Sequence, residues 1–423
     1  MKDFAAKAKL VFEDAALRRR LIFTIVALTI FRLFASVPMP GIDAARLQEL
    51  LASNQFLGLF NIFSGGGLSN LSIVMLGVGP FITSTIIMQL MTLMIPKLKE
   101  MYHEEGEAGR ARFSQYSRLL TIPLALIQGF GFLHLLTAQG VVPELSFFGQ
   151  LVSILTVAAG SILLMWLGEL ITEFGIGNGV SLLIFAGIVS VLPSQVSQLA
   201  FAFDPSQIPL YVAFIVVSLI VILGVVIVTE AERPIPVTYA KRVRGMKVYG
   251  GVSTYLPLRV NQAGVIPIIF ALSLLILPQM LFQFLVNVPN ELVRSISDFV
   301  LGVLENQLLY AAFYFVLVFF FTYFYTAVTF DPEAISTNLQ KSGAFIPGVR
   351  PGRPTALYLS QVLTRITFVG AIFLSVIAVL PYIMQAITAN AALAVGGTSL
   401  LIVVSVVLDL VRRLNAQITM REY

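Results

Sequence analysis

Ten apolar runs, most of them close to twenty residues long, dominate this sequence of 423 residues. A helix of about twenty apolar residues is long enough to cross the hydrocarbon core of a membrane, which is about 30 Å thick. The composition agrees, because 57% of the residues are apolar and 12% are charged, whereas about a quarter are charged in soluble domains. We therefore expect an all-α, polytopic membrane protein with spans at 21–37, 73–95, 119–138, 149–171, 180–199, 209–229, 262–286, 307–330, 364–387 and 398–411.

The first run, 21–37, follows a charged segment and has some features of a signal peptide. Its length and Arg32 near its far end fit a cleaved signal poorly, and further spans follow. We interpret it as an uncleaved first span. Ten spans then place both termini on the same side of the membrane.

The loops on the two sides differ in charge. With both termini on one side, the loops of the opposite side carry Arg46 and Arg294 against seven acidic residues. Apart from Arg32 in the first span and Arg365 at the start of the ninth, every other Lys and Arg lies at the termini or in the loops of the first side. Because positive loops stay in the cytoplasm, the sequence predicts that both termini are cytoplasmic.

Two loops on the expected cytoplasmic side, 230–260 and 330–361, are too long to be simple connectors. The alternating stretch from Val248 to Leu258 predicts a β-hairpin. The dense turn residues of 347–354 favour an ordered docking surface. Their basic residues have two interpretations: the inside-positive signal with attraction to anionic lipid, or a surface for ribosomal RNA or an acidic protein.

The stretch 60–93 begins as an apolar helical turn, is broken at Gly65, Gly66 and Gly67, and continues as about twenty apolar residues. Lipid cannot satisfy the free backbone groups of a broken segment, so such a segment must be buried in protein or line a cavity. The pattern therefore predicts a short non-spanning half-helix folded into the middle of the protein.

Several kinds of chemistry have no support in the residues. Cysteine is absent, and two histidines, His103 and His134, are far apart in the sequence, so we expect no metal site and no cofactor. No Ser/His/Asp set, pair of carboxylates or HExxH motif occurs in a plausible place, so we expect no enzyme activity. The glycine-rich run from Gly175 to Gly179 resembles a phosphate loop, but a span rather than a strand precedes it. We interpret that run as the end of one helix and the start of the next.

No acidic residue lies in the middle of a span, because Glu169 and Asp409 are close to span ends. The polar residues in the middle of the spans are uncharged, and they include Thr83, Gln89 and Gln128. Ion-coupled transporters usually keep ionisable groups at this depth. A passive or externally driven conduit therefore fits better than the two alternatives, a secondary transporter for a small solute and an intramembrane enzyme.

Eight blocks then carry a specific resemblance. The blocks are FNIFSGG (60–66), STIIMQL (84–90), EGEAGRARFSQYSR (105–118), MWLGELITEFGIGNGVSLLIFAGI (165–188), YAKRVRG (239–245), LPLRVNQAGVIPIIFA (256–271), NLQKSGAFIPGVRPG (338–352) and GGTSLLIV (396–403). In order and spacing they are similar to the SecY family, the channel subunits of the bacterial Sec protein translocon.

This resemblance implies ten transmembrane helices in two pseudo-symmetric inverted halves, 1–200 and 201–423. The halves surround an hourglass pore that is closed by a plug half-helix and opens sideways to lipid between the second, third, seventh and eighth spans. Such a channel translocates unfolded secretory polypeptides and releases membrane-protein segments laterally. It is driven by SecA or the ribosome and has no catalysis of its own.

The resemblance also assigns roles to residues. A plug at 57–71 includes Phe60, Asn61, Ser64, Gly65, Gly66, Gly67 and Leu68. The pore ring is Val78, Ile82, Val180, Ile184, Ile269 and Ile402, and the lateral gate includes Ile86, Gln89, Gln128 and Asn261. SecA or the ribosome is expected to contact Lys241, Arg242, Arg244 and Arg350.

The partners that the resemblance implies are SecE and SecG, SecA, the ribosome with its RNA and proteins, signal peptides and nascent chains, and membrane lipids. The expected location is the cytoplasmic membrane of a bacterium.

Overall fold

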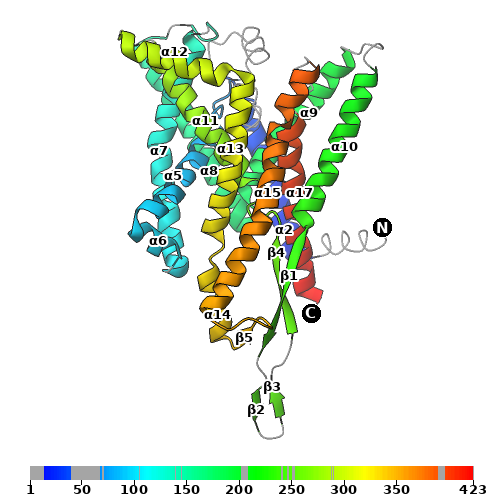
Figure 1. Ribbon diagram of the computed structural model, residues 1–423. Helices are drawn as coiled ribbons and strands as arrows, with labels where there is room; N and C mark the ends of the chain where they lie inside the picture. The colour runs from blue at the N-terminus through cyan, green and yellow to red at the C-terminus, as the bar shows by residue number, and fades with distance from the viewer. Residues whose placement is uncertain are drawn as a thin grey trace.

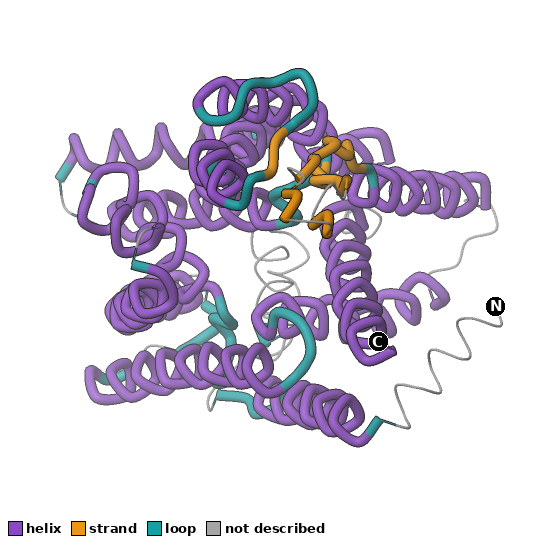
Figure 2. The backbone as a smooth tube through the Cα atoms, turned by 90° about the horizontal axis from the view of Figure 1, so that it is seen from below, coloured by secondary structure: helices purple, strands orange, loops and turns teal. Residues whose placement is uncertain are grey.

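The structure is a computed structural model in which a bundle of long helices carries a small group of strands at one end (Figure 1). From that end, the helices are seen to surround a common centre rather than to form flat layers (Figure 2). The residues that the structure describes are 14–39, 67–68, 71–103, 105–138, 140–143, 145–201, 208–239, 242–244, 247–249, 253–286, 288, 290–388 and 396–422.

Each of the ten expected spans coincides with a helix. Several helices run beyond the apolar segment, because hydropathy marks the part of a helix that suits lipid, whereas charged turns can continue the same helix into water. The helices are α2 (Ala15–Ala35), α5 (Gly79–Met94), α7 (Gly106–Ala138), α8 (Phe147–Phe174), α9 (Gly179–Phe201), α10 (Ile208–Glu230), α11 (Ile266–Leu285), α13 (Gln307–Thr329), α15 (Arg353–Thr388) and α17 (Gly396–Glu422).

Length and composition alone identify fewer spans. Five of the described helices pass such a test, or six if α5 and the short α6 (Pro96–His103) count as one bent span. The helix α2 carries Arg18, Arg19, Arg20 and Arg32, and the apolar parts of α9 and α11 are shorter than a full span. A helix inside a bundle tolerates such features because its neighbours, rather than lipid, surround part of it.

Local signals set several helix ends, of which the sequence predicts the one at the glycine run 175–179. The glycine run at 175–179 ends α8 and starts α9, since Gly175 is the C-cap of α8 and Gly179 is the first residue of α9. The second loop contains α14 (Pro332–Lys341), whose N-cap Asp331 accepts hydrogen bonds from two backbone N–H groups. Proline directly after an aspartate N-cap is a common way to begin a helix.

The strands form an antiparallel sheet in the order β4-β1-β5 and a separate hairpin of β2 and β3. The expected hairpin within Val248–Leu258 is wrong, because Val248 belongs to β3 and Leu258 to β4, and both strands pair with earlier residues. Pairing β4 with β1 packs Leu258 with Ile235 and Val237, which a local hairpin does not achieve. The strands are β1 (Glu232–Tyr239), β2 (Arg242–Arg244), β3 (Lys247–Tyr249), β4 (Ser253–Arg259) and β5 (Ala344–Phe345).

The two long loops share one apolar core. Ile235 of β1 and Ile346 after β5 are buried in the same cluster as Leu359 and Leu363 of α15. The loops therefore form a packed unit on the end of α15, as expected of an ordered surface.

Candidate functional site

A single buried apolar cluster lies where α5, α9, α11 and α17 meet. Five of the six residues expected to form a ring are buried in it: Val78, Ile82, Ile184, Ile269 and Ile402. These positions are spread over more than three hundred residues of sequence. The fold therefore brings together side chains that no local pattern connects.

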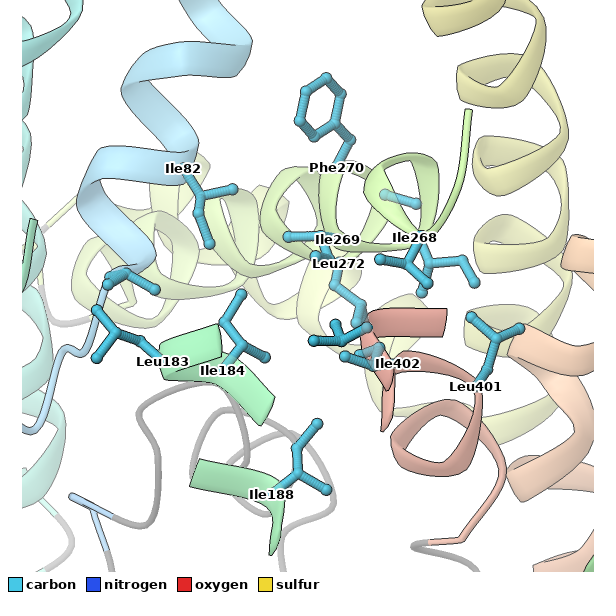
Figure 3. Close-up of a cluster of buried hydrophobic side chains, with 14 of the residues drawn as sticks. Ile82, Leu183, Ile184, Ile188, Ile268, Ile269, Phe270, Leu272, Leu401 and Ile402 are labelled. Atoms are coloured by element: carbon cyan, nitrogen blue, oxygen red, sulfur yellow. The ribbon is translucent and has the colours of Figure 1, made fainter. Parts of the chain in front are cut away.

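Figure 3 shows Ile82, Ile184, Ile269 and Ile402 facing a common centre from four different helices. The sixth residue, Val180, is partly exposed and packs at the edge of the cluster. It also lies against α8, since a Cβ added to Gly168 would be 3.2 Å from its Cγ2 atom.

Sequence reasoning missed several members of this cluster. Nothing in the sequence marks them, because an apolar residue in a span looks the same whether it faces the centre, a neighbouring helix or lipid. The additional residues labelled in the same view are Leu183, Ile188, Ile268, Phe270, Leu272 and Leu401.

The cluster offers ions no favourable surroundings. Its members are aliphatic or aromatic, and a narrow apolar constriction expels water and so prevents hydrated ions from passing. Among the described residues, no group of three or more acidic, histidine or cysteine side chains could hold a metal ion. The arrangement therefore favours a seal over a reaction centre.

Beside the cluster, α11 packs on both α5 and α7. The amide of Gln128 on α7 donates a hydrogen bond to the hydroxyl of Thr83 on α5, at 3.4 Å. The Ser84 hydroxyl on α5 donates to the backbone oxygen of Ser117 on α7. Two further expected gate residues, Ile86 and Gln89, are buried on α5, so three of the four lie on this helix pair.

The fourth expected gate residue, Asn261, lies in a different place, just before α11. It lines a polar pocket of about 290 Å³ together with Asn178, Ser405, Asp409 and Arg413. Within the described part of the chain its Oδ1 atom is buried and accepts no hydrogen bond. This pocket lies near the strand end, whereas Gln128 lies deeper in the bundle.

Charged residues at the span ends bind one another. Arg118 of α7 pairs with Glu169 of α8 at 2.5 Å. Arg412 of α17 pairs with Glu230 at the end of α10 at 2.7 Å and also donates to the carbonyl oxygen of Thr229. These pairs tie neighbouring helices together outside the apolar centre.

Comparisons with known proteins decide the family. The SecY family model matches residues 72–411. The chain belongs to the SecY family. Among its relatives are the protein translocase subunits SecY of Corynebacterium glutamicum, 42% identical with 97% of each chain covered, and of Thermotoga maritima, 43% identical with 98% of this chain and 96% of the relative covered.

Solved structures share the ten-helix channel fold of the SecY family. One, described as a protein-conducting channel, has a TM-score of 0.66 at 19% identity, with 96% of this chain and 93% of that chain covered. A SecY protein whose plug domain stabilises the closed state has a TM-score of 0.65 at 20% identity, with the same coverage. Sec61 from a canine ribosome–channel complex has a TM-score of 0.62 at 19% identity, again with the same coverage.

The expected SecY-family plug is described at its end only. Leu68 is buried among residues of α7 that include Phe132 and Leu136. The backbone oxygen of Gly67 accepts a hydrogen bond from the Ser72 N–H at 2.8 Å. The other expected plug residues, Phe60, Asn61, Ser64, Gly65 and Gly66, lie outside the described residues.

The junction between this segment and α5 is irregular. Residues 71–78 form turns, and Gly77 has a φ of +58°, a conformation open mainly to glycine. Leu71 has a φ of +39°, and left-handed backbone costs a residue with a side chain about 1–2 kcal/mol. Its carbonyl oxygen accepts from the Met39 N–H at 2.9 Å, and this bond helps to hold the strained conformation.

The basic residues expected to dock SecY-family partners lie at the strand end. Arg242 and Arg244 are on β2, in the hairpin that projects farthest from the bundle (Figure 1). Arg350 is exposed in the turn between β5 and α15, and its carbonyl oxygen accepts from the Thr355 hydroxyl at 2.9 Å. Lys241 lies outside the described residues.

Proposed function

We propose that this chain is the channel subunit of a protein translocase. Unfolded secretory polypeptides pass through its centre, and apolar segments of membrane proteins leave sideways into lipid. The observation that carries this proposal is the buried meeting of Ile82, Ile184, Ile269 and Ile402 from four helices. Val78 and Val180 complete the proposed pore ring.

An apolar ring suits a polypeptide of any sequence. Aliphatic side chains make no specific hydrogen bonds, so a passing chain displaces them without being bound tightly. When the channel is empty, the same side chains pack together and exclude water and ions. Transport then needs an outside source of energy, and the ring itself catalyses no reaction.

The proposed sideways exit lies between α5 and α7 on one side and α11 and α13 on the other. The packing of α11 against both α5 and α7 supports this, because separating one helix from two neighbours opens the bundle to lipid. Signal peptides bind there, beside Ile86, Gln89 and Gln128. Asn261 acts at the strand-side entrance of the same exit, where it lines the polar pocket.

Two larger features belong to the proposal. The segment 57–71 is a plug on the side of the ring that faces away from the strands, and the left-handed turns at Leu71 and Gly77 support a hinge between it and α5. Residues 1–200 and 201–423 are the two inverted halves, each contributing five spans.

The proposed partners act at the strand end, on the cytoplasmic side, where both termini lie. SecA or the ribosome contacts Lys241, Arg242, Arg244 and Arg350, and SecE and SecG complete the complex in a bacterial cytoplasmic membrane. Ribosome-bound structural neighbours, Sec61 from canine endoplasmic reticulum and the yeast Ssh1 complex, support the ribosome as a partner.

Reconstitution tests the proposal directly. Vesicles containing the full chain with SecE and SecG are given SecA, ATP and a secretory precursor, and we expect the precursor to become protected from added protease. Leaving out ATP is the control, because the chain has no energy source of its own. A precursor that stays fully accessible, in vesicles that instead accumulate a small solute, would support a secondary transporter.

A further inference from the structure

The helix α12 (Glu291–Glu305) connects the end of α11 to the start of α13. It lies at the end of the bundle opposite the strands and runs across the direction of α13 rather than along it (Figure 1). The sequence had indicated only an outer loop here. Its fifteen residues present three different faces.

The first face packs on the bundle. Ser297 is fully buried, and its hydroxyl donates to the backbone oxygen of Val293 at 2.7 Å. About two turns farther on, Leu304 packs against the main apolar cluster. This face holds α12 against the bundle.

The second face is apolar and exposed. Leu292, Ile296 and Phe299 are 76%, 57% and 73% exposed. Their spacing of four and three residues places them in a single stripe along the helix. A soluble protein rarely exposes such a stripe unless something covers it.

The third face is charged. Arg294 pairs with Asp298 one turn later at 4.0 Å, and Glu291 is close to the same side of the helix. At 100° per residue, Arg294 lies nearly opposite the stripe. The helix therefore separates an apolar from a charged surface, with the bundle between them.

We propose that α12 lies in the membrane interface at this end of the bundle, with Leu292, Ile296 and Phe299 among the lipid acyl chains and the charged face in water. Interfacial helices combine such a stripe with a charged face and lie flat at the boundary of the hydrocarbon.

The depth of α12 supports lipid as the occupant. The 23 residues of α13 span about 34 Å at 1.5 Å per residue, close to the thickness of the hydrocarbon core. Its first residue, Gln307, therefore lies near the boundary, and α12 ends two residues earlier. Two apolar residues near the start of α13, Leu308 and Phe313, are also exposed.

The net charge of α12 indicates which force holds it at the membrane interface. Three acidic residues, Glu291, Asp298 and Glu305, outnumber its single basic residue, Arg294. Attraction to anionic lipid, which strengthens basic interfacial helices, is absent here. Binding rests on apolar burial, so it is independent of lipid charge.

Fluorescence quenching tests this placement, because the sequence contains no cysteine and accepts a single label. The full chain, in complex with its partner subunits, carries Phe299→Cys or, as the matched control on the charged face, Arg294→Cys. Both variants are labelled with a small polarity-sensitive dye and reconstituted in vesicles of neutral or anionic phospholipid. Leu292→Cys repeats the measurement at a second stripe position.

We expect brominated acyl chains to quench the labels at 299 and 292, and iodide in the water to quench them several-fold less than the label at 294, in both kinds of vesicle. Equal quenching of the 299 and 294 labels by iodide would place the stripe in water and overturn the proposal. A label at 299 shielded from both quenchers would also overturn it, because a protein subunit rather than lipid would then cover the stripe.

Discussion

The role proposed for Ile82, Ile184, Ile269 and Ile402 depends on the absence of polar groups in their side chains. None of these side chains can coordinate an ion or form a hydrogen bond with water, and all four are buried where four helices meet. The proposed seal is therefore a property of the group rather than of one residue. A single polar substitution should weaken the seal without disturbing the fold at large.

We predict that Ile82→Ser and Ile402→Ser each increase the resting ion leak. A hydroxyl at the constriction stabilises water there, and a barrier lower by about 1.4 kcal/mol raises a rate roughly tenfold. Conductance of planar bilayers containing the complex measures the leak. The matched control is Ile215→Ser on the exposed surface of α10, which should leave the leak unchanged; an unaltered conductance in the two ring variants would contradict the ring assignment.

At a second residue, Gly160, two backbone segments pack closely against each other. Gly160 of α8 lies against the carbonyl oxygen of Ile73, so that an added Cβ would collide with it. The neighbouring Ser161 hydroxyl donates to the carbonyl oxygen of Gly77 at 2.9 Å. These two residues hold the irregular turns before α5 in place.

We predict that Gly160→Ala destabilises the protein, although alanine is the better helix former. Overpacking costs about 1–3 kcal/mol, more than the roughly 1 kcal/mol that alanine gains over glycine in a helix. The midpoint temperature of heat-induced aggregation in detergent should fall. Gly302→Ala on α12 is the control, since nothing lies within 4 Å of an added Cβ there, and it should keep or raise the midpoint.

At the scale of elements, two loops that are about seventy residues or more apart in sequence form one unit. β5 extends the sheet of β1 and β4, and the shared core with α15 holds the sheet to the bundle. The β2–β3 hairpin projects beyond this unit (Figure 1). The packed unit is a base for this hairpin, and we call the basic residues Lys241, Arg242 and Arg244 its tip. Such an arrangement is suited to reach a large anionic partner.

We predict that reversing the charge of the tip, with Lys241→Glu, Arg242→Glu and Arg244→Glu together, abolishes ribosome binding in a flotation assay. Lysine and arginine contacts to nucleic-acid phosphates provide most of such affinity at physiological salt. Arg294→Glu, at the opposite end of the molecule, should bind normally. If the triple variant binds ribosomes fully, these three residues serve only to set the orientation of the protein in the membrane and to attract anionic lipid.

At the scale of the whole molecule, the contacts between the two proposed halves set the balance between closed and open states. α11 packs on α5 and α7, and α17 packs on α9, while Ile86 of α5 is buried in the same cluster as Ile269 and Leu272 of α11. Opening toward lipid has to expose this contact. The balance between closed and open states therefore depends on apolar burial between α5 and α11.

We predict that Ile86→Ser shifts this balance toward the open state. Losing one or two kcal/mol of closed-state packing changes a two-state ratio by a factor of about 5 to 30. A precursor with a weakened signal peptide should then be translocated several-fold better in vesicles. Ile127→Ser on α7, where the side chain is 64% exposed, should give no gain, and an equal gain in both variants would argue against the gate.

The sequence by itself determined the class of protein, the order of its ten spans and the helix boundary at the glycine run. Apolar runs and glycines such as Gly175 act over a few neighbouring residues, so their effect can be read along the chain. The resemblance in eight blocks supplied the family and the candidate residues.

Only the tertiary structure decided which distant residues meet. The convergence of Ile82, Ile184, Ile269 and Ile402, the pairing of β4 with β1, and the exposed stripe on α12 depend on contacts between helices and strands far apart in sequence. In an apolar span, one isoleucine looks like the next. Packing against particular neighbours is what distinguishes a residue of the central cluster from one that faces lipid.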